Sequence, residues 1–328
     1  MKRIWLLVIA GGVCAALAVP CLIFLSRPPV LVVTEAPFAA LYGADHLRRE
    51  RVSASRALFR RVKPVRVADG ASPDIVIFAI TEASPRPMCV LFARTQAGTA
   101  LLFHEQFPEI PVVVISGLTA VPELPAPDGL LCVYGTDRET DLYRAGLFAG
   151  ILGNARQPPP RPAENQAETA PASQAGAPAA QADIRRTYVL WQDRYVRAAG
   201  REIFSRGLME EDPESTVIFA NSAAQVPDMK GISCMVLTGA GSEYLDKNPT
   251  MPLILFAWTD PAFTAKEVII QFDDSPWALA VPAARMAAQQ QADGKIPSKP
   301  LIFSGKIADN SIFRLLKKSA EKTPLKET

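Results

Sequence analysis

Short apolar runs recur along the chain between residues 29 and 306, and stretches of helix length and mixed polarity separate them. Runs of about five to seven residues that are rich in Val, Ile and Leu are typical of strands buried on both faces of a sheet. Strands that alternate with helices in this way predict an α/β fold with parallel sheets covered on both sides.

The same pattern predicts the position of each element. We expect strands at 29–34, 62–67, 74–80, 110–115, 130–134, 187–191, 216–220, 233–237, 252–258, 267–271 and 300–303. We expect helices at about 38–61, 95–106, 138–153, 194–208, 275–293 and 309–321. Ser275 and Pro276 support the start of the fifth helix, because Ser is a preferred N-cap and Pro is favoured in the first turn.

Residues 130–154 connect two sets of elements. They read as a strand, a sharp Gly-Thr-Asp turn and a helix that ends near a glycine. The strand is the last of the elements before it in the chain, and it leads into the first helix of the elements that follow. This arrangement predicts two lobes joined by a hinge. We expect lobe 1 at 29–137, completed by about 272–328, and lobe 2 at 138–271.

The composition changes abruptly after the helix expected at 138–153. Residues 157–183 consist mainly of Pro, Ala, Gln, Glu, Ser and Thr, with no large apolar residue. Such a segment cannot bury enough apolar surface to offset the entropy lost on ordering it. We therefore expect a disordered surface insert at about 155–185, within lobe 2.

The N-terminus carries an uncharged apolar stretch at 4–25, directly after a Lys-Arg pair. A membrane helix needs roughly 20 apolar residues, whereas the core of a cleavable signal has about 7–15. The length favours a membrane anchor at 1–28, with the basic start in the cytoplasm and the bulk of the chain in the periplasm or outside the cell. A lipoprotein, through Cys14 or Cys21, and a cleaved signal remain as alternatives.

Composition and motifs exclude several classes of function. The net charge of +2 implies no nucleic-acid partner. Cys89, Cys132 and Cys234 lie in apolar runs, which are the setting of small buried side chains, and their spacing fits neither a disulfide framework nor a zinc site. No nucleophile–base pair and no phosphate-binding glycine loop is recognisable. We therefore expect no enzyme activity, no cofactor and no metal.

Four stretches carry a family resemblance. They are TDRETDLYRAGLFAGIL (136–152), WQDRYVRAAGREIF (191–204), LILFAWTDPAFTAKEVIIQ (253–271) and SPWALAVPAARMAAQQQADGKIPSKPLIF (275–303). Together they resemble the type I periplasmic binding proteins and the related ligand-sensing cores of LacI-type repressors. The first stretch is most similar to the basic membrane protein branch, whose segment reads like AGYLAGVLAA. The resemblance implies two Rossmann-like lobes joined by a hinge, with a ligand held in the cleft between them.

The chain departs from the sugar-binding members of this family at two turns. Ser116 stands after the fourth strand, where those proteins usually have an Asp. The turn that begins at Thr238 continues with Gly-Ala-Gly instead of carrying an Asn or Asp, which favours the basic membrane protein branch. A DNA-binding headpiece is absent and the apolar N-terminal segment takes its place, so the resemblance implies no repressor function.

Ligands of open α/β sheets bind beyond the carboxyl ends of the strands. Carboxylates at such positions can hold hydroxyl groups by charge-assisted hydrogen bonds, and aromatic rings can stack on a sugar or a base. The candidate ligand-binding residues selected by this rule and by the resemblance are Glu35, Phe38, Ser116, Asp137, Arg197, Thr238, Trp258, Asp260 and Asp274. Thr81 and Glu82 follow the strand expected at 74–80 and are selected by the same rule.

Most of these candidates have a structural alternative. Asp137 and Asp260 suit caps of turns or helices. Asp274 precedes a Ser-Pro helix start, where a negative charge favours the helix dipole. The aromatic candidates suit core packing, and Arg197 suits a solvated helix face.

The resemblance implies an extracytoplasmic, membrane-tethered solute-binding protein at the inner membrane. It would capture a small polar ligand, a nucleoside or a sugar, and deliver it to an ABC-type permease. The alternative is a sensory or structural module of the same fold that acts through a protein partner such as a membrane sensor, and Ser116 and the long insert favour it. An enzyme on the same fold is a third alternative, which no motif supports.

Overall fold

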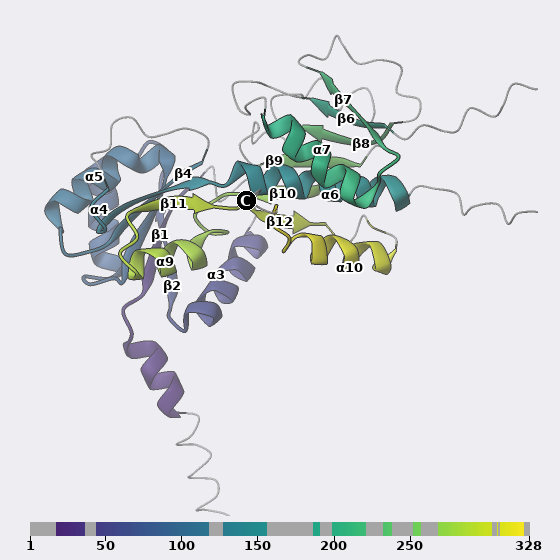
Figure 1. Ribbon diagram of the computed structural model, residues 1–328. Coiled ribbons are helices and arrows are strands. Elements are labelled where there is room, and N and C mark those ends of the chain that lie inside the picture. Colours follow the sequence, from purple (N-terminus) through teal and green to yellow (C-terminus); the bar gives the residue numbers. More distant parts are fainter. Residues whose placement is uncertain are drawn as a thin grey trace, which may run out of the picture. The chain divides into compact units, whose positions relative to one another are not determined.

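The computed structural model describes residues 18–36, 44–117, 127–155, 186–190, 199–220, 232–237, 252–256, 268–303, 307 and 309–324. Contacts within the chain divide it into two units, and each contains a six-stranded sheet (Figure 1). The first unit comprises Met1–Thr136 and Asp274–Ile296, and the second comprises Asp137–Asp273 and Pro297–Thr328. The chain therefore passes between the units three times, at 136/137, 273/274 and 296/297.

The strands of the first sheet are β1 (Val30–Glu35), β2 (Val62–Val67), β3 (Cys89–Ala93), β4 (Val112–Gly117), β5 (Leu131–Thr136) and β11 (Asp293–Ile296). They are all parallel, in the order β11-β5-β4-β3-β1-β2. After β1 the chain forms β2 on one side and then returns to form β3 on the other side. The direction in which the sheet grows therefore changes between β1 and β3, at a topological switch point.

The helices of the first unit are α3 (Ala44–Leu58), α4 (Pro73–Ala83), α5 (Ala97–Gln106) and α9 (Ala280–Ala288), with a short 3-10 helix at Arg94–Gln96. α3 and α9 cover one face of the sheet, where Ala54 and Ala283 join Val32 in one core cluster. α4 and α5 cover the other face, where Phe103 joins Leu31 in a second cluster. Successive residues of β1 thus face opposite helix layers, which explains its continuous apolar sequence.

The strands of the second sheet are β6 (Arg186–Leu190), β7 (Thr216–Ala220), β8 (Ile232–Leu237), β9 (Leu253–Phe256), β10 (Val268–Asp273) and β12 (Lys299–Ile302). Their order is β12-β10-β9-β8-β6-β7, with β12 antiparallel to β10 and the other pairs parallel. The first strand of this unit, β6, lies between the second and the third, as β1 does in the first sheet.

The helices of the second unit are α6 (Arg138–Ala155), α7 (Ala199–Glu211) and α10 (Asn310–Ser319). Phe148 of α6, Phe204 of α7 and Leu316 of α10 lie in one core cluster with Phe272 of β10. α6 and α7 approach each other through glycines, since a Cβ atom on Gly207 would lie 2.1 Å from the carbonyl oxygen of Tyr143. Such close contact of two helix backbones requires a residue without a side chain.

The strand expected at 74–80 is wrong, because this segment belongs to α4. Ser72 has an extended backbone and a Pro occupies the first helical position, an arrangement that starts a helix. Ile75 and Phe78 on α4 are 60% and 67% exposed, so the apolar run continues onto the solvent face. A continuous apolar run does not distinguish a buried strand from a helix. The third strand of the sheet is instead β3, which the sequence pattern missed.

The helix expected at 275–293 is shorter in the structure. Residues 275–279 form a turn in which the Ser275 hydroxyl accepts a hydrogen bond of 3.2 Å from the Ala278 amide, and α9 begins after it. Ser275 therefore caps a turn and not the helix. The end of the expected helix is occupied by β11, which pairs with β5.

The C-terminal residues join the second unit, whereas the sequence expectation assigned all of 272–328 to lobe 1. β12 extends the second sheet by pairing with β10. The fully buried carboxylate of Asp141 on α6 accepts hydrogen bonds from both the amide and the hydroxyl of Ser298. These bonds attach the segment that follows β11 to the second unit.

Among the described residues, no helix is both long and apolar enough to cross a membrane. Residues 18–26 form a helix, and the rest of the anchor expected at 1–28 lies mostly outside the described residues. The insert expected at about 155–185 also lies outside them, apart from Ala155.

Candidate functional site

The switch point of the first sheet carries a polar cluster. Glu35 is the last residue of β1, and Thr95 and Gln96 follow the end of β3 on the next strand. The carboxyl ends of parallel strands meet at one edge of the sheet, and the edge beside a switch point is where open α/β sheets bind ligands. Glu35 thus lies where the fold itself favours a ligand site.

Both carboxylate oxygens of Glu35 accept hydrogen bonds in this cluster. The Thr95 hydroxyl donates to Oε2 at 3.0 Å, and the Gln96 side-chain amide donates to Oε1. Gln96 is buried, and its own oxygen accepts from the Thr99 hydroxyl at 2.9 Å. These bonds orient the carboxylate. Because a carboxylate has about four lone-pair sites, Glu35 retains capacity for further donors.

Thr34, beside Glu35 on β1, has a structural role. The buried indole of Trp277 donates from Nε1 to the Thr34 hydroxyl at 2.9 Å, and this hydroxyl donates to the Val32 carbonyl at 3.2 Å. Trp277 is only 3% exposed, so its ring packs in the core and does not form an exposed stacking surface.

Asp274 lies where the chain re-enters the first unit. Its carboxylate accepts a hydrogen bond of 3.1 Å from the hydroxyl of Thr136, the residue at which the chain first leaves this unit. The side chain therefore ties together two of the segments that connect to the second unit.

Asp137 caps α6 in the second unit. Its carboxylate accepts from the Thr140 amide at 3.3 Å and from the Thr140 hydroxyl at 2.8 Å. This is the arrangement of an N-terminal helix cap, in which an Asp satisfies an amide of the first turn.

The remaining candidates are placed only in part. Ser116 is the fifth residue of β4, near the carboxyl end of that strand. The candidates outside the described residues are Phe38, Arg197, Thr238, Trp258 and Asp260. In the second sheet the chain beyond β6, β7, β8 and β9 likewise falls outside the described part, so the geometry of the site rests on the first unit.

The hydrophobic pattern does not identify Thr95 and Gln96 as site residues. It predicts a strand at 74–80, and the strand-end rule then selects Thr81 and Glu82, which lie on α4 instead. The signal was present in the apolar run that includes Cys89, which is directly followed by Arg-Thr-Gln. Assigning that run to a strand would have identified both residues.

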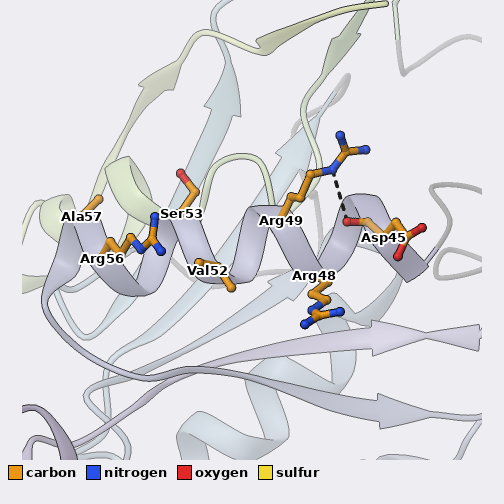
Figure 2. A pocket seen from close by; sticks show the side chains of 7 residues that line it. All are labelled: Asp45, Arg48, Arg49, Val52, Ser53, Arg56 and Ala57. Atoms are coloured by element: carbon orange, nitrogen blue, oxygen red, sulfur yellow. Dashed lines mark hydrogen bonds between the residues drawn. The ribbon is translucent and has the colours of Figure 1, made fainter. Parts of the chain in front are cut away.

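A separate hollow follows one face of α3. Its lining residues recur at spacings of three and four, and Figure 2 shows several arginine side chains along the helix. Arg49 donates from Nε to the Asp45 carbonyl at 3.4 Å. The lining residues are Asp45, Arg48, Arg49, Val52, Ser53, Arg56 and Ala57. The lining contains three guanidinium groups and only one carboxylate, so this face of α3 is basic.

The cysteines of the first sheet lie in its core. Burial raises the pKa of the Cys89 thiol to about 12, so the reactive thiolate is suppressed at neutral pH. Cys132 is also buried, and its pKa is raised for the same reason. Within the described ranges, no group of three or more His, Cys, Asp or Glu residues is placed to hold a metal ion.

No protein-family model matches the sequence, and no curated protein matches it. The structure is similar to an ABC transporter system solute-binding protein from Conexibacter woesei, with a TM-score of 0.51, 13% identity and coverage of 90% of this chain and 95% of that one. It is also similar to a transcriptional activator of the comK gene from Bacillus halodurans, with a TM-score of 0.48, 10% identity and coverage of 90% and 96%. A third similar structure is an ABC transporter periplasmic solute-binding protein from Actinobacillus succinogenes with bound D-allose, with a TM-score of 0.43, 9% identity and coverage of 85% and 99%.

At these identities the likeness concerns the fold. This chain has two α/β units, each with its first strand between the second and the third, and passes between them three times. The similarity to the Conexibacter woesei structure extends over 90% of this chain. The protein therefore has a type I periplasmic binding protein-like fold.

Proposed function

We propose that this protein is an extracytoplasmic, membrane-tethered solute-binding protein. It captures a small polar ligand, a sugar or a nucleoside, at the carboxyl edge of its first sheet and passes it to an ABC-type permease. The observation that carries the proposal is the Glu35 carboxylate at the switch point, oriented by Thr95 and Gln96.

The chemistry of this cluster suits a ligand with hydroxyl groups. Hydrogen bonds from hydroxyl donors to an ionised carboxylate are roughly twice as strong as neutral ones. Threonine and glutamine side chains beside the carboxylate both donate and accept, as a polyhydroxylated ligand requires. The only tryptophan among the described residues, Trp277, is buried, so stacking on a nucleobase would depend on Phe38 or Trp258.

The connections between the units suit a hinge. Solute-binding folds close on a ligand by a hinge motion in which a few residues at the ends of elements absorb the change. The hydrogen bond from Thr136 to Asp274 joins two of the three connecting segments. We propose that this bond keeps the two segments together as the hinge bends.

A thermal-stability screen of the full chain tests the proposal. The panel contains monosaccharides, nucleosides and, as a negative class, amino acids. A ligand present at a hundred times its dissociation constant adds about 2.7 kcal/mol of stability, which is a measurable rise in the unfolding midpoint. A rise with sugars or nucleosides supports the proposed function, and unchanged midpoints across the panel would contradict it.

A second function is favoured by one observation. The exposed apolar residues Ile75 and Phe78 on α4 suit a surface that contacts another protein, as expected for a sensory or structural module. A chain that binds no member of the panel but forms a complex with a membrane sensor, lost in Ile75→Ser/Phe78→Ser, would establish this function instead.

A further inference from the structure

The helix at 18–26 directly precedes β1 at the amino edge of the first sheet (Figure 1). Its apolar side chains are exposed. Val19, Leu22 and Leu25 are between 54% and 65% exposed. The residues that precede this helix continue the same uncharged apolar stretch, which begins at residue 4. An exposed apolar surface of this kind marks a contact with another protein or with a membrane.

The helix at 18–26 is attached to the end of α3. The ring of Phe24 contacts that of Phe59 edge-on, with centroids 5.9 Å apart, and the Arg27 guanidinium lies 5.1 Å from the centre of the Phe59 ring. Arg60 donates from Nη1 to the Pro28 carbonyl at 3.3 Å. Phe59 is itself 43% exposed, so it extends the apolar surface of the helix.

Arginines surround this apolar surface. Arg56 lies in the last turn of α3, and Arg60 and Arg61 form the turn into β2. The Met88 amide donates to the Pro29 carbonyl, which places the chain before β3, with the exposed Arg86, beside the start of β1. We call Arg27, Arg56, Arg60, Arg61 and Arg86 the amino-edge arginines.

Carboxylates do not neutralise the amino-edge arginines within the described part of the chain. None of the five guanidinium groups forms an ion pair with a carboxylate of the described residues, whereas Lys322, in the second unit, pairs with Glu210 and Glu211. Asp128 and Glu109 also lie at the amino edge, but before β5 and β4, on the side of the sheet away from β2.

On the β2 side, the exposed carboxylate of Glu82 lies in the last turn of α4, and Lys63 at the start of β2 donates to the Ala83 carbonyl at the end of this helix. One carboxylate and one ammonium group leave the excess of positive charge on this side unchanged. Positive charge is thus concentrated where the helix at 18–26 joins the unit.

We propose that the amino edge of the first unit docks on an anionic lipid surface. The exposed apolar residues of the helix at 18–26, together with Phe59, enter the interfacial region, and the amino-edge arginines bind lipid phosphates. Guanidinium groups suit this task because they form paired hydrogen bonds to phosphate. The combination of an apolar insertion and a basic surface is what holds peripheral segments on anionic membranes.

This docking leaves the ligand cluster free. Glu35 lies at the carboxyl end of β1 and Val30 at its amino end, and six residues of strand span roughly 20 Å. The proposal deepens the membrane-tethered part of the proposed function, while ligand capture is a separate property of the opposite edge. Failure of docking with intact ligand binding would therefore leave the solute-binding function standing.

The test uses the full chain in lipid nanodiscs, either of phosphatidylcholine alone or with phosphatidylglycerol. Cys14 and Cys21 are replaced by Ser, and an environment-sensitive fluorophore is attached to Ala57→Cys in the last turn of α3, beside the amino-edge arginines. Docking shifts the emission to shorter wavelength in the anionic nanodiscs only. High salt should reverse the shift, because the Debye length falls to about 3 Å at 1 M.

The variant Arg27→Gln/Arg56→Gln/Arg60→Gln should lower the ratio of docked to undocked protein roughly a hundredfold, since each basic residue near an anionic surface contributes a factor of about five. The matched control Arg314→Gln/Lys317→Gln/Lys318→Gln removes the same charge from exposed positions of α10 and should dock as the parent protein does. The proposal is overturned if the emission is the same in both kinds of nanodisc, or if the α10 control variant loses docking as much as the arginine variant does. It is also overturned if the chain does not co-purify with the nanodiscs.

Discussion

Glu35, the last residue of β1, accepts a hydrogen bond of 3.0 Å from the hydroxyl of Thr95, which lies just past β3. The two residues are 60 positions apart in the sequence. They meet because β3 pairs with β1 on the side opposite to β2, so that the carboxyl ends of β1 and β3 are neighbours. The strand order thus creates the carboxylate cluster on which the proposed ligand site depends.

Replacing Gly207 by Ala should destabilise the second unit. The added Cβ would lie 2.1 Å from the Tyr143 carbonyl oxygen, which belongs to the backbone of α6 and cannot move without separating the two helices. Overpacking of this kind costs typically about 1–3 kcal/mol, and a backbone clash belongs at the upper end of that range. Thermal or denaturant unfolding of the purified chain measures the loss.

The matched control is Gly98→Ala on α5, where a Cβ would meet no atom within 4 Å. Ala is favoured over Gly in a helix by roughly 0.5–1 kcal/mol, so this variant should be slightly more stable than the parent. A Gly207→Ala protein as stable as the Gly98→Ala protein would show that α6 and α7 do not pack as closely as described.

Asp141→Asn should weaken the attachment of the C-terminal segment to α6. The buried Asp141 carboxylate accepts from the amide and the hydroxyl of Ser298, and an Asn side chain has only one acceptor oxygen. Hydrogen bonds to charged groups contribute about 1.5–3 kcal/mol each, so a loss of about 2 kcal/mol is expected in denaturant unfolding. Asp309→Asn is the control, because Asn caps the start of α10 as well as Asp does.

Acid should selectively remove the contribution of Glu210. Hydrogen bonds from Lys322 and Tyr143 hold the pKa of the Glu210 carboxyl below its ordinary value. A depressed folded-state pKa gives stability that is present above the unfolded pKa of about 4.3 and is lost as the pH falls through the folded value. Glu210→Gln should therefore lower the unfolding midpoint at pH 7 and lower it less at pH 3.

Glu321→Gln, an exposed change in the same C-terminal segment, serves as the control for Glu210→Gln. Its effect on the midpoint should be small at both pH values. An effect of Glu210→Gln that stays the same from pH 7 to pH 3 would show that the Lys322–Glu210 pair does not stabilise the folded state.

Much of the fold could be predicted from hydrophobic patterning. β2 has the predicted bounds, and α6 begins at the predicted residue, because their apolar runs end at clear turn residues. β11 could not be predicted in this way. Its sequence, Asp-Gly-Lys-Ile, contains one apolar residue, and it becomes a strand because β5 offers it a free edge to pair with.

The residues of the candidate site could be predicted only where the end of a strand could be predicted from the sequence. The rule that ligands bind beyond the carboxyl ends selected Glu35 and Asp274, which the structure places at the edge of the first sheet and at a connection between the units. It does not select Thr95 and Gln96, because the apolar pattern predicts a strand at 74–80, where α4 lies, and none at β3. Thr95 and Gln96 come from a distant segment, so their hydrogen bonds to Glu35 depend on the order of the strands in the sheet. A single sequence does not specify that order.

The proposed ligand-binding role of Glu35 is tested most directly by calorimetric titration of the full chain. The ligand is the sugar or nucleoside that gives the largest rise in thermal stability, and the variants are Glu35→Gln and Glu82→Gln, an exposed position on α4. We expect Glu35→Gln to raise the dissociation constant about 10–100-fold, because a hydrogen bond to a charged group contributes about 1.5–3 kcal/mol. Glu82→Gln should bind as the parent protein does. A dissociation constant of Glu35→Gln equal to that of the parent would contradict the assignment of the ligand site to the switch point of the first sheet.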